Sequence, residues 1–306
     1  MSLHAFGDLV LASQVPLPAL PISRETRSDL SFRVKAVAPY RGRRWDHHWY
    51  LPGGAVSLSC ARFGEDYRLG FPGSATFEIR DEATAVECIP ERSLPANTVE
   101  HLLIDQVLPR VLTHHGRLVL HAGCVGIDGR AVLLLGESGA GKSTLCASLA
   151  TFGHVLLGDD GVWLRRVGAG SFEVAATYPG LRLRPEPLAF HYREAGAFDP
   201  VADTSDKRRV PTPELAGARL PLHRVYVLAA PGTGSVRVGP LRGADAFVAL
   251  LSATFQLHLD DPGRASAMFD GLGDLIDTVP VRALAYPRTY DRLPEVREAI
   301  LDDLAV

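Results

Sequence analysis

The sequence predicts a mixed α/β protein: a small β-rich domain, residues 1–112, followed by a phosphate-loop domain, residues 113–306. Two observations predict the larger domain. The apolar run 131–135 leads into a glycine-rich turn, and a helix-forming sequence follows that turn. A third observation predicts the smaller domain, because its short alternating segments between Gly, Pro and Asp turns are typical of β-strands.

Bulk composition is that of a globular protein. The 306 residues are 46% hydrophobic and 22% charged, and the net charge of −3 gives no reason to expect a nucleic-acid partner. No run of about 18 apolar residues occurs, so we expect no membrane span. Four cysteines are widely spaced, with no C-x-x-C pair and no secretory leader, which indicates reduced thiols in a cytoplasmic protein. They are Cys60, Cys88, Cys124 and Cys146.

The N-terminal region alternates between apolar and polar residues. Strands are predicted at 32–37, 56–60, 67–71, 76–80 and 84–89. Residues 1–30 are weakly periodic and fit either a loose leader or an edge strand. Residues 41–49 are basic, aromatic and histidine-rich; a solvated loop is the simpler interpretation, and a surface that grips an acidic peptide is the alternative.

A helix is predicted after these strands. Asn97 would cap it, and Glu100, three residues later, would complete a capping box. The apolar pattern runs on to Leu108, and Pro109 predicts a kink or bend at that point.

The second domain opens with a predicted strand over residues 117–127. Asp128-Gly129 then predicts a tight hairpin turn into the strand that precedes the glycine-rich segment. The helix after that segment is expected to stop at Phe152-Gly153.

The remaining elements follow in order. An apolar strand is predicted at 154–160, residues 179–186 are expected to form an ordered loop, and residues 190–213 lack apolar periodicity. Further strands are predicted at 162–167, 172–176, 222–230 and 284–286, and helices at 244–256, 264–277 and 293–304.

The glycine-rich segment matches the phosphate-binding pattern G-x-x-x-x-G-K-[ST]. Lys142 would reach the β- and γ-phosphates of a nucleoside triphosphate, and the Ser143 hydroxyl would bind Mg²⁺. Lysine occurs only three times in the chain, which makes a chance match rare; an ordinary glycine-rich turn is the alternative. The predicted nucleotide-binding positions are Gly136, Glu137, Ser138, Gly139, Ala140, Gly141, Lys142, Ser143 and Thr144.

Two adjacent carboxylates, Asp159 and Asp160, end the strand that follows the loop helix. One would hold Mg²⁺ together with Ser143, and the other would orient an acceptor hydroxyl and take its proton. A polar turn without catalytic function is the alternative.

Three further residues are candidates for the same chemistry. His121 would tune a catalytic carboxylate or contact the acceptor, although a satisfied core histidine fits the sequence equally well. Lys207 and Arg208 belong to a compact basic cluster and would stabilise a transferring phosphoryl group. A solvated surface loop is the alternative for both.

Three segments together resemble the core of the HPr kinase/phosphorylase family. They are Leu120-His121-Ala122-Gly123, the loop of pattern G-x-S-G-x-G-K-S at 136–143, and the strand 153–160 that ends in the Asp pair. The resemblance covers residues 115–230, and the C-terminal helices more loosely. It implies an HPr kinase-like core with a mixed sheet and flanking helices, which binds ATP and Mg²⁺ and phosphorylates a protein serine.

The resemblance also implies roles for single residues. It makes Asp159 the general base and Asp160 its metal-side companion, and it places His121 in the same active site. The chain departs from the family after the Asp pair, where an Arg-Gly-Leu-Gly signature survives only as residues 179–182, Pro-Gly-Leu-Arg. The resemblance therefore does not extend to phosphorolysis or to the metal contact of that signature.

The N-terminal region does not resemble that of HPr kinases. The overall form is closer to shorter HPr kinase-like proteins of peptide-modification clusters, among them kinases that phosphorylate a serine of lasso-peptide precursors. We therefore expect an ATP- and Mg²⁺-dependent serine kinase acting on a peptide or small protein, and the sequence permits a homo-oligomer. The rivals are a small-molecule kinase, an ATPase without acceptor, and a nucleotide-binding regulator.

Overall fold

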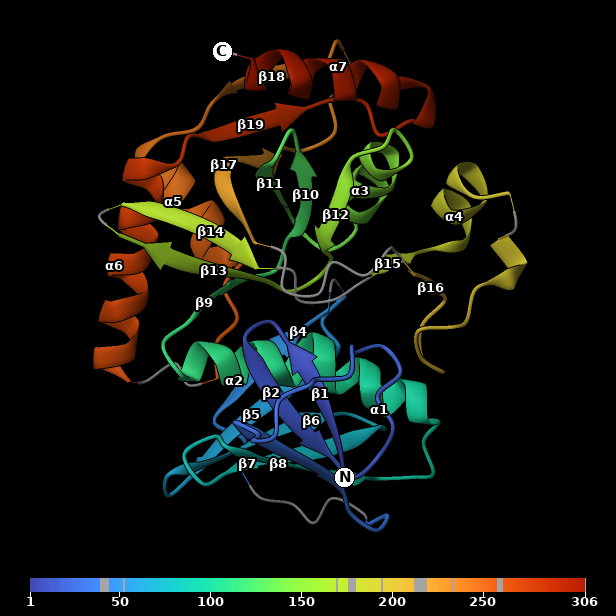
Figure 1. The fold of residues 1–306 in the computed structure, drawn as a ribbon, viewed down its shortest axis with the longest axis vertical. Helices are drawn as coiled ribbons and strands as arrows, with labels where there is room; N and C mark the ends of the chain where they lie inside the picture. The colour runs from blue at the N-terminus through green and yellow to red at the C-terminus, as the bar shows by residue number, and fades with distance from the viewer. Residues whose placement is uncertain are drawn as a thin grey trace.

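The computed structural model describes residues 1–305 except 39–43, 52, 169, 176–179, 194, 212–218, 233 and 258–260. The described part has a mixed α/β fold, as predicted, with an eight-stranded and a nine-stranded sheet and a separate two-stranded one. Figure 1 shows the larger sheet and its helices on one side of a helical layer and the eight-stranded sheet on the other. Of the basic segment 41–49, residues 41–43 lie outside the described residues.

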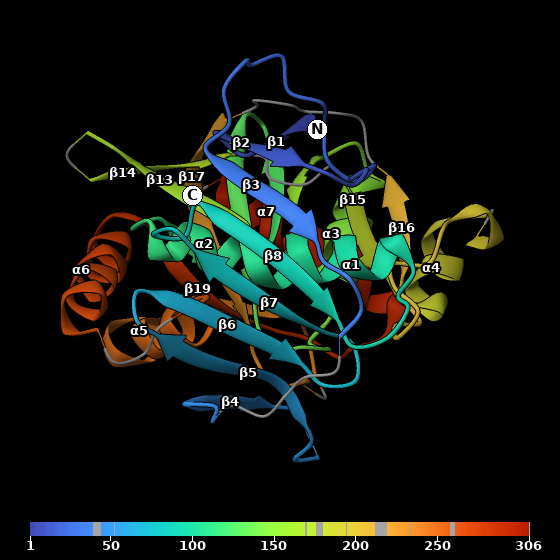
Figure 2. The same ribbon diagram turned by 90° about the horizontal axis from the view of Figure 1, so that it is seen from below.

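The N-terminal sheet contains the first eight strands in the order β1-β2-β3-β8-β7-β6-β5-β4, side by side in Figure 2. Its strands are β1 (Ser2–Phe6), β2 (Leu9–Ser13), β3 (Leu30–Val34), β4 (His47–Tyr50), β5 (Val56–Phe63), β6 (Asp66–Phe71), β7 (Ala75–Arg80) and β8 (Ala85–Pro90). Alternation selects the buried face: in β3 the side chains of Leu30 and Phe32 are buried while Arg33 is exposed. The predicted strands of this region are confirmed, except that the strand predicted over 32–37 already ends at Val34, and residues 1–30 contribute two strands at one edge.

The helix after β8 differs from the prediction in how it begins and in what interrupts it. It consists of α1 (Ala96–Leu102), a π-helical turn η1 (Leu103–Val107) and α2 (Leu108–His114). The predicted capping box is wrong: Pro95 is the N-cap residue, and the Asn97 amide donates a hydrogen bond to the carbonyl of Pro200, 3.0 Å away. The side chains of Asn97 and Glu100 therefore form tertiary hydrogen bonds instead of a capping box.

The predicted irregularity near Pro109 takes the form of this π-helical turn. Pro109 has no N–H to donate to the carbonyl of Asp105, four residues earlier, and the wider turn lies just before the proline. The predicted domain boundary, between residues 112 and 113, falls inside α2.

The second sheet has the order β12-β10-β11-β17-β14-β13-β9, with β19 beside β17 and β18 beside β19. Its strands are β9 (Leu118–Leu120), β10 (Gly123–Ile127), β11 (Arg130–Leu135), β12 (Val155–Gly158), β13 (Val162–Val167), β14 (Ser171–Ala175), β17 (Arg219–Leu228), β18 (Arg237–Pro240) and β19 (Val281–Ala285). The single strand predicted over 117–127 is wrong, because β9 pairs with β13 whereas β10 pairs with β11 and β12. The break falls at His121, whose N–H donates to the carbonyl of Ala253.

Helices cover the second sheet where the periodicity predicts them. They are α3 (Lys142–Ala150), α5 (Gly243–Ser252), α6 (Pro262–Thr278) and α7 (Leu293–Leu304). The hairpin turn between β10 and β11 is confirmed: Asp128 and Gly129 both have positive φ, 47° and 75°, as a type I′ turn requires. None of the helices in the described residues is both long and apolar enough to cross a bilayer.

Segments predicted as loops or as lacking periodicity form regular structure instead. In the segment 41–49, the solvated loop that was the simpler interpretation is wrong for residues 47–49, which belong to β4. Strands β15 (Gly180–Leu183) and β16 (Arg208–Pro211) pair as a small antiparallel sheet, and α4 (Pro185–His191) follows β15. Leu181, Leu183 and Val210 are buried in it. The pairing joins segments about 25 residues apart, so neither strand carries a local signal of its own.

The cores of the two halves are continuous. The hydrophobic cluster of the N-terminal sheet includes Trp163, Phe255 and Leu257 from the second half, and Trp163 is only 3% exposed. A Cβ placed on Gly7 would stand 2.6 Å from the Trp163 ring, so the first hairpin packs directly on this side chain. The four cysteines are buried and carry free thiols.

Candidate active site

The phosphate loop lies between β11 and the N-terminus of α3, as the sequence predicts. Gly141 is the N-cap residue of α3 with φ of 93°, in the left-handed region that only glycine adopts without strain. Gly136 has φ of 153°, and a Cβ there would stand 3.1 Å from the Cβ of Ala140. These two positions fix the loop so that the α3 N-terminus is presented as an anion-binding end.

Lys142 is held inside this loop. Its side chain is 6% exposed, and the Nζ atom donates to the carbonyls of Gly136 at 2.8 Å and Glu137 at 3.2 Å. Burial lowers its pKa, while the charges of Asp160 and Asp159 oppose the shift. The ammonium group therefore sits between the loop and the carboxylate pair.

Asp159 contacts the loop helix directly. Its Oδ1 atom accepts a hydrogen bond from the Ser143 hydroxyl at 2.9 Å, and its Oδ2 atom accepts one from the backbone N–H of Arg182 at 2.9 Å. Asp159 is 1% exposed. Burial, and then the charge of Asp160, raise its pKa to about 6, although Arg182 opposes the shift.

Asp160 faces His121, Arg182 and Lys207 instead. His121 Nε2 lies 3.3 Å from its Oδ1 atom, and its Oδ2 atom lies 3.7 Å from Arg182 and 3.8 Å from Lys207 Nζ. Although burial alone would raise the pKa of Asp160, the hydrogen bond with His121 and the charges of Lys207 and Arg182 hold it well below the usual range. Asp160 has a φ of 69°, a left-handed backbone conformation that is uncommon for residues other than glycine.

The structure brings most of the predicted site residues together. The phosphate loop, both Asp residues, His121 and Lys207 converge at the carboxyl end of β12, whose arrow in Figure 1 points toward the α1–α2 layer. His121 is not a core residue, because its side chain is 37% exposed.

Arg208 is not brought to the carboxylate pair. Its side chain is exposed, and its guanidinium lies 3.4 Å from the carbonyl of Phe198. Sequence reasoning missed Arg182 as a functional candidate. The one signal for it was its place in the Pro-Gly-Leu-Arg remnant of the family signature, a departure that we had related only to phosphorolysis and to a metal contact. The structure places this arginine against both carboxylates.

The oxygen donors in this site suit Mg²⁺. A hydroxyl and a carboxylate, Ser143 and Asp159, lie side by side, and hard oxygen ligands of this kind are what the ion prefers. Among the described residues, no group of three or more His, Cys, Asp or Glu side chains could hold a metal by itself. Mg²⁺ bound to a nucleotide needs only one or two protein ligands, since phosphate oxygens and water complete its shell.

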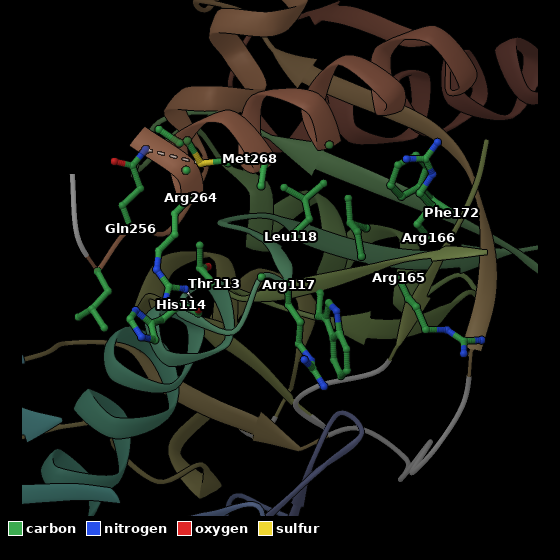
Figure 3. Close-up of a pocket in the computed structure, with 18 of the residues that line it drawn as sticks. Thr113, His114, Arg117, Leu118, Arg165, Arg166, Phe172, Gln256, Arg264 and Met268 are labelled. Carbon is green, nitrogen blue, oxygen red and sulfur yellow. Dashed lines mark hydrogen bonds between the residues drawn. The ribbon is translucent and has the colours of Figure 1, made fainter. Parts of the chain in front are cut away.

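A separate cavity of about 670 Å³ lies between β9, β13 and α6 and contains none of the predicted site residues. Figure 3 shows its lining, in which arginine side chains stand among Leu118, Phe172 and Met268. Those arginines already have acidic partners: Arg117 pairs with Asp8, Arg165 with Glu173, Arg166 with Asp274 and Arg264 with Asp261. The positive charges in this lining are therefore paired with neighbouring carboxylates.

Comparisons with known proteins point to one family. No family model matches the chain. An HPr kinase/phosphorylase of Caldicellulosiruptor bescii is 44% identical over 65 residues, which cover 21% of this chain and 19% of that protein. Another, of Caldanaerobacter subterraneus subsp. tengcongensis, is 40% identical over 73 residues, which cover 24% of this chain and 22% of that protein.

The chain thus spans only about a fifth of the length of the curated relatives it matches. A solved structure, the HPr(Ser) kinase/phosphatase of Coxiella burnetii, is similar with a TM-score of 0.33 and 14% identity, over 60% of this chain and 95% of that one. The predicted relationship is confirmed in this form: the chain is distantly related to HPr kinase/phosphorylases over part of its length.

Proposed function

We propose that this protein is an ATP- and Mg²⁺-dependent kinase with an HPr kinase-like core, which phosphorylates a serine hydroxyl of a peptide or small protein. The observation that carries the proposal is the pair Asp159–Asp160 at the phosphate loop, with one carboxylate on Ser143 and the other facing His121 and Lys207. An ATPase needs only the first of these carboxylates, whereas transfer to a hydroxyl also needs a group that orients the acceptor.

Each residue then has a role that follows from its position. The backbone N–H groups of the loop and Lys142 bind the phosphates, and Ser143 and Asp159 hold Mg²⁺, which neutralises phosphate charge when bound. Asp160 accepts the hydrogen bond of the acceptor hydroxyl and takes its proton. The acceptor oxygen forms a bond to the γ-phosphorus, the bond from that phosphorus to the β-phosphate oxygen breaks, and ADP leaves.

The geometry favours the reverse of the roles that the family resemblance implies for the two carboxylates. Asp159 is the residue that touches Ser143, and it is almost fully buried. Asp160 has the more exposed side chain, 14% against full burial of its neighbour, and its own cationic neighbours. We therefore assign the metal side to Asp159 and the acceptor side to Asp160.

Transfer of γ-³²P from ATP to synthetic serine peptides encoded by neighbouring genes tests the proposal. We expect Mg²⁺-dependent label on a peptide serine. Asp160→Asn should lower transfer by about a hundredfold or more, while the affinity for Mg²⁺ and a fluorescent ATP analogue stays within about threefold. Asp159→Asn should instead raise the Mg²⁺ concentration needed for half-maximal binding.

Other outcomes argue for other functions. Free phosphate without a labelled acceptor, from every peptide offered, would favour an ATPase or a small-molecule kinase. Absence of nucleotide binding by the wild-type protein would overturn the phosphate-loop assignment. If Asp160→Asn altered Mg²⁺ dependence and Asp159→Asn did not, the two roles would be the reverse of those proposed.

A further inference from the structure

The helix that connects the two halves contacts residues of the candidate site through buried carboxylates. Asp105, in the π-helical turn, forms an ion pair with Arg182, and the two side chains are 3% and 1% exposed. The same carboxylate pairs with His101 one turn earlier. Arg182 in turn donates its backbone N–H to Asp159, and its guanidinium lies 3.7 Å from Asp160. One arginine thus links the helix to both site carboxylates.

A second carboxylate of this helix acts in parallel. Glu100 is 1% exposed, accepts the backbone N–H of Ala19 at 2.7 Å, and accepts a hydrogen bond from Arg209 at 2.8 Å. Arg209 and Arg182 are direct cross-strand partners in the β15–β16 pair. The helix therefore holds both strands of this pair, each by one arginine.

One of the two carboxylates that hold the arginines lies in the π-helical turn. Asp105 is inside the turn, and Glu100 lies in α1 just before it. Such π-turns within α-helices are frequent at functional sites. The two carboxylates reach neighbouring strands of one small sheet.

The β15–β16 pair carries groups that surround the carboxylate pair. Arg182 belongs to β15, and Lys207, whose Nζ atom lies 3.8 Å from Asp160, directly precedes β16. The segment before Lys207 is also bound to the helix, because Thr98 donates its hydroxyl hydrogen to Asp203 at 2.8 Å. The contacts thus extend from the first turn of α1 to the edge of the site.

Stability alone does not call for this arrangement. Removing two charges from water costs several kcal/mol per ion, and hydrophobic side chains in place of a buried ion pair are often as stable or more stable. What a buried pair of this kind supplies is a defined direction for the guanidinium group. Here that direction is toward Asp159 and Asp160.

We propose that Asp105 and Glu100 are positioning residues of the phosphoryl-transfer site, so that the N-terminal half contributes to the catalytic geometry as well as to any partner binding. Asp105 fixes Arg182 against the carboxylate pair, and Glu100 fixes β16 and thereby Lys207. The catalytic part of this inference rests on the proposed kinase function. The positioning part concerns the structure itself and is tested without any turnover.

Hydrogen–deuterium exchange of the full-length protein measures the positioning directly. In Asp105→Asn, we expect amides of residues 159–161 and 180–183 to exchange at least about tenfold faster than in the wild type, beyond any change in global stability. In Glu100→Gln, the acceleration should instead centre on residues 207–211. Adding Asp105→Asn to Arg182→Gln should change the exchange little beyond that of Arg182→Gln alone, because the loss of the arginine already removes its ion pair with Asp105.

Glu78→Gln is the matched control. It breaks another buried ion pair of the N-terminal half, between Glu78 and Arg68, with side chains 8% and 10% exposed. This pair joins β7 and β6 of the N-terminal sheet, and Glu78 also pairs with Arg80 of β7, whereas Asp105 and Glu100 pair with β15 and β16. We expect its variant to lose global stability without selective exchange at residues 159–161 or 180–183.

Kinetics then test the catalytic consequence. Asp105→Asn should lower kcat for phosphate transfer by at least about tenfold while KM for MgATP changes by less than about threefold. Exchange at 159–161 and 180–183 equal to that of the wild type, in both Asp105→Asn and Glu100→Gln, would overturn the positioning whatever the kinetics show. A wild-type protein that transfers no phosphate would overturn the kinase proposal alone, since the exchange result does not depend on it.

Discussion

At the scale of single residues, the pKa values of the neighbouring carboxyls Asp159 and Asp160 are shifted in opposite directions. Asp159 is buried against Ser143 and feels the charge of Asp160, so its pKa is raised to about 6. Asp160 is stabilised as an anion by His121 and Lys207, so its pKa is lowered. Two carboxylates with pKa values pushed apart by their surroundings are typical of sites that divide two roles between them.

The raised pKa of Asp159 predicts a pH-dependent stability of the metal-free protein. Since the folded state binds this proton more tightly than the unfolded state, the contribution is complete below about pH 3.8 and is lost as pH rises through about 6. Asp159→Asn removes this titration. Its free energy of unfolding, relative to wild type, should therefore rise between pH 4 and pH 7, by on the order of 2–3 kcal/mol.

Urea denaturation in the presence of a chelator measures this difference. Asp199→Asn, a change at an exposed carboxyl outside the site, is the control for the general effect of removing one carboxyl group. A stability difference for Asp159→Asn that falls as pH rises would contradict the environment described for this carboxyl.

Two adjacent cations give a second prediction at this scale. Lys207 Nζ lies 3.8 Å from Asp160, whereas the guanidinium of Arg208 lies near the carbonyl of Phe198. Lys207→Ala should lower phosphate transfer by about tenfold or more, because a charge beside the transferring group is lost. Arg208→Ala should stay within about twofold of the wild type, and equal losses in both variants would show that the whole cluster acts on the site.

At the scale of elements, the strand–loop–helix unit determines where a phosphate can bind. Gly136 and Gly141 have positive φ, and Lys142 bonds to two loop carbonyls, so the loop is shaped by its own residues. The unit is local in sequence, from Arg130 to Ala150, which is why its pattern is readable without tertiary information.

Gly141→Ala separates the function of the loop from simple backbone strain. An added Cβ at φ of 93° should cost about 1–2 kcal/mol of stability. It should also weaken binding of a fluorescent ATP analogue by at least about tenfold, because the altered residue is the helix N-cap at which the proposed function places the phosphates.

Gly153→Ala is the matched control for this change. Gly153 has φ of 91°, and a Cβ there would meet no atom within 4 Å, just after the other end of α3. A similar loss of stability with unchanged nucleotide affinity is expected. Equal losses of nucleotide affinity in both variants would mean that binding depends on the overall stability of α3 and not on the loop residue itself.

At the scale of the whole molecule, the two halves share a hydrophobic core and are joined by buried ion pairs between side chains. Trp163 and Phe255 from the second half belong to the cluster beneath the N-terminal sheet, and Asp105 and Glu100 pair with arginines of β15 and β16. Units joined in this way are expected to unfold together rather than one after the other.

Trp163→Ala tests the shared core. Truncation of this buried side chain should cost about 3–5 kcal/mol. Tryptophan fluorescence of the variant comes only from Trp45 and Trp49, both in the N-terminal half. The unfolding curve measured by this fluorescence should coincide with the curve measured by far-UV circular dichroism, which reports on the whole chain.

An exposed aromatic residue provides the comparison. Tyr50 is 61% exposed, and Tyr50→Ala should change stability by no more than about 0.5 kcal/mol. Two separate transitions in Trp163→Ala, with the N-terminal fluorescence changing first, would show that the halves are independent domains.

The sequence by itself determined the elements whose cause is local. The phosphate loop follows from the spacing of its glycines and Lys142, the hairpin turn from Asp128-Gly129, and the major helices from their apolar periodicity. The Asp pair and His121 could be named as candidates because each ends a strand or strand segment near the loop. The distant relationship to HPr kinase/phosphorylases was readable from the same short motifs.

Only the tertiary structure decided which partners these residues have and which of them lie in the site. It placed Asp159 rather than Asp160 on Ser143, moved Arg208 away from the site, and brought in Arg182 from a segment that local patterns marked as a loop. It also turned Glu100 from a predicted helix cap into a partner of Arg209. The physical reason is that buried ion pairs and the β15–β16 pairing join residues from 25 to more than 100 positions apart, and such contacts leave no periodicity in the chain.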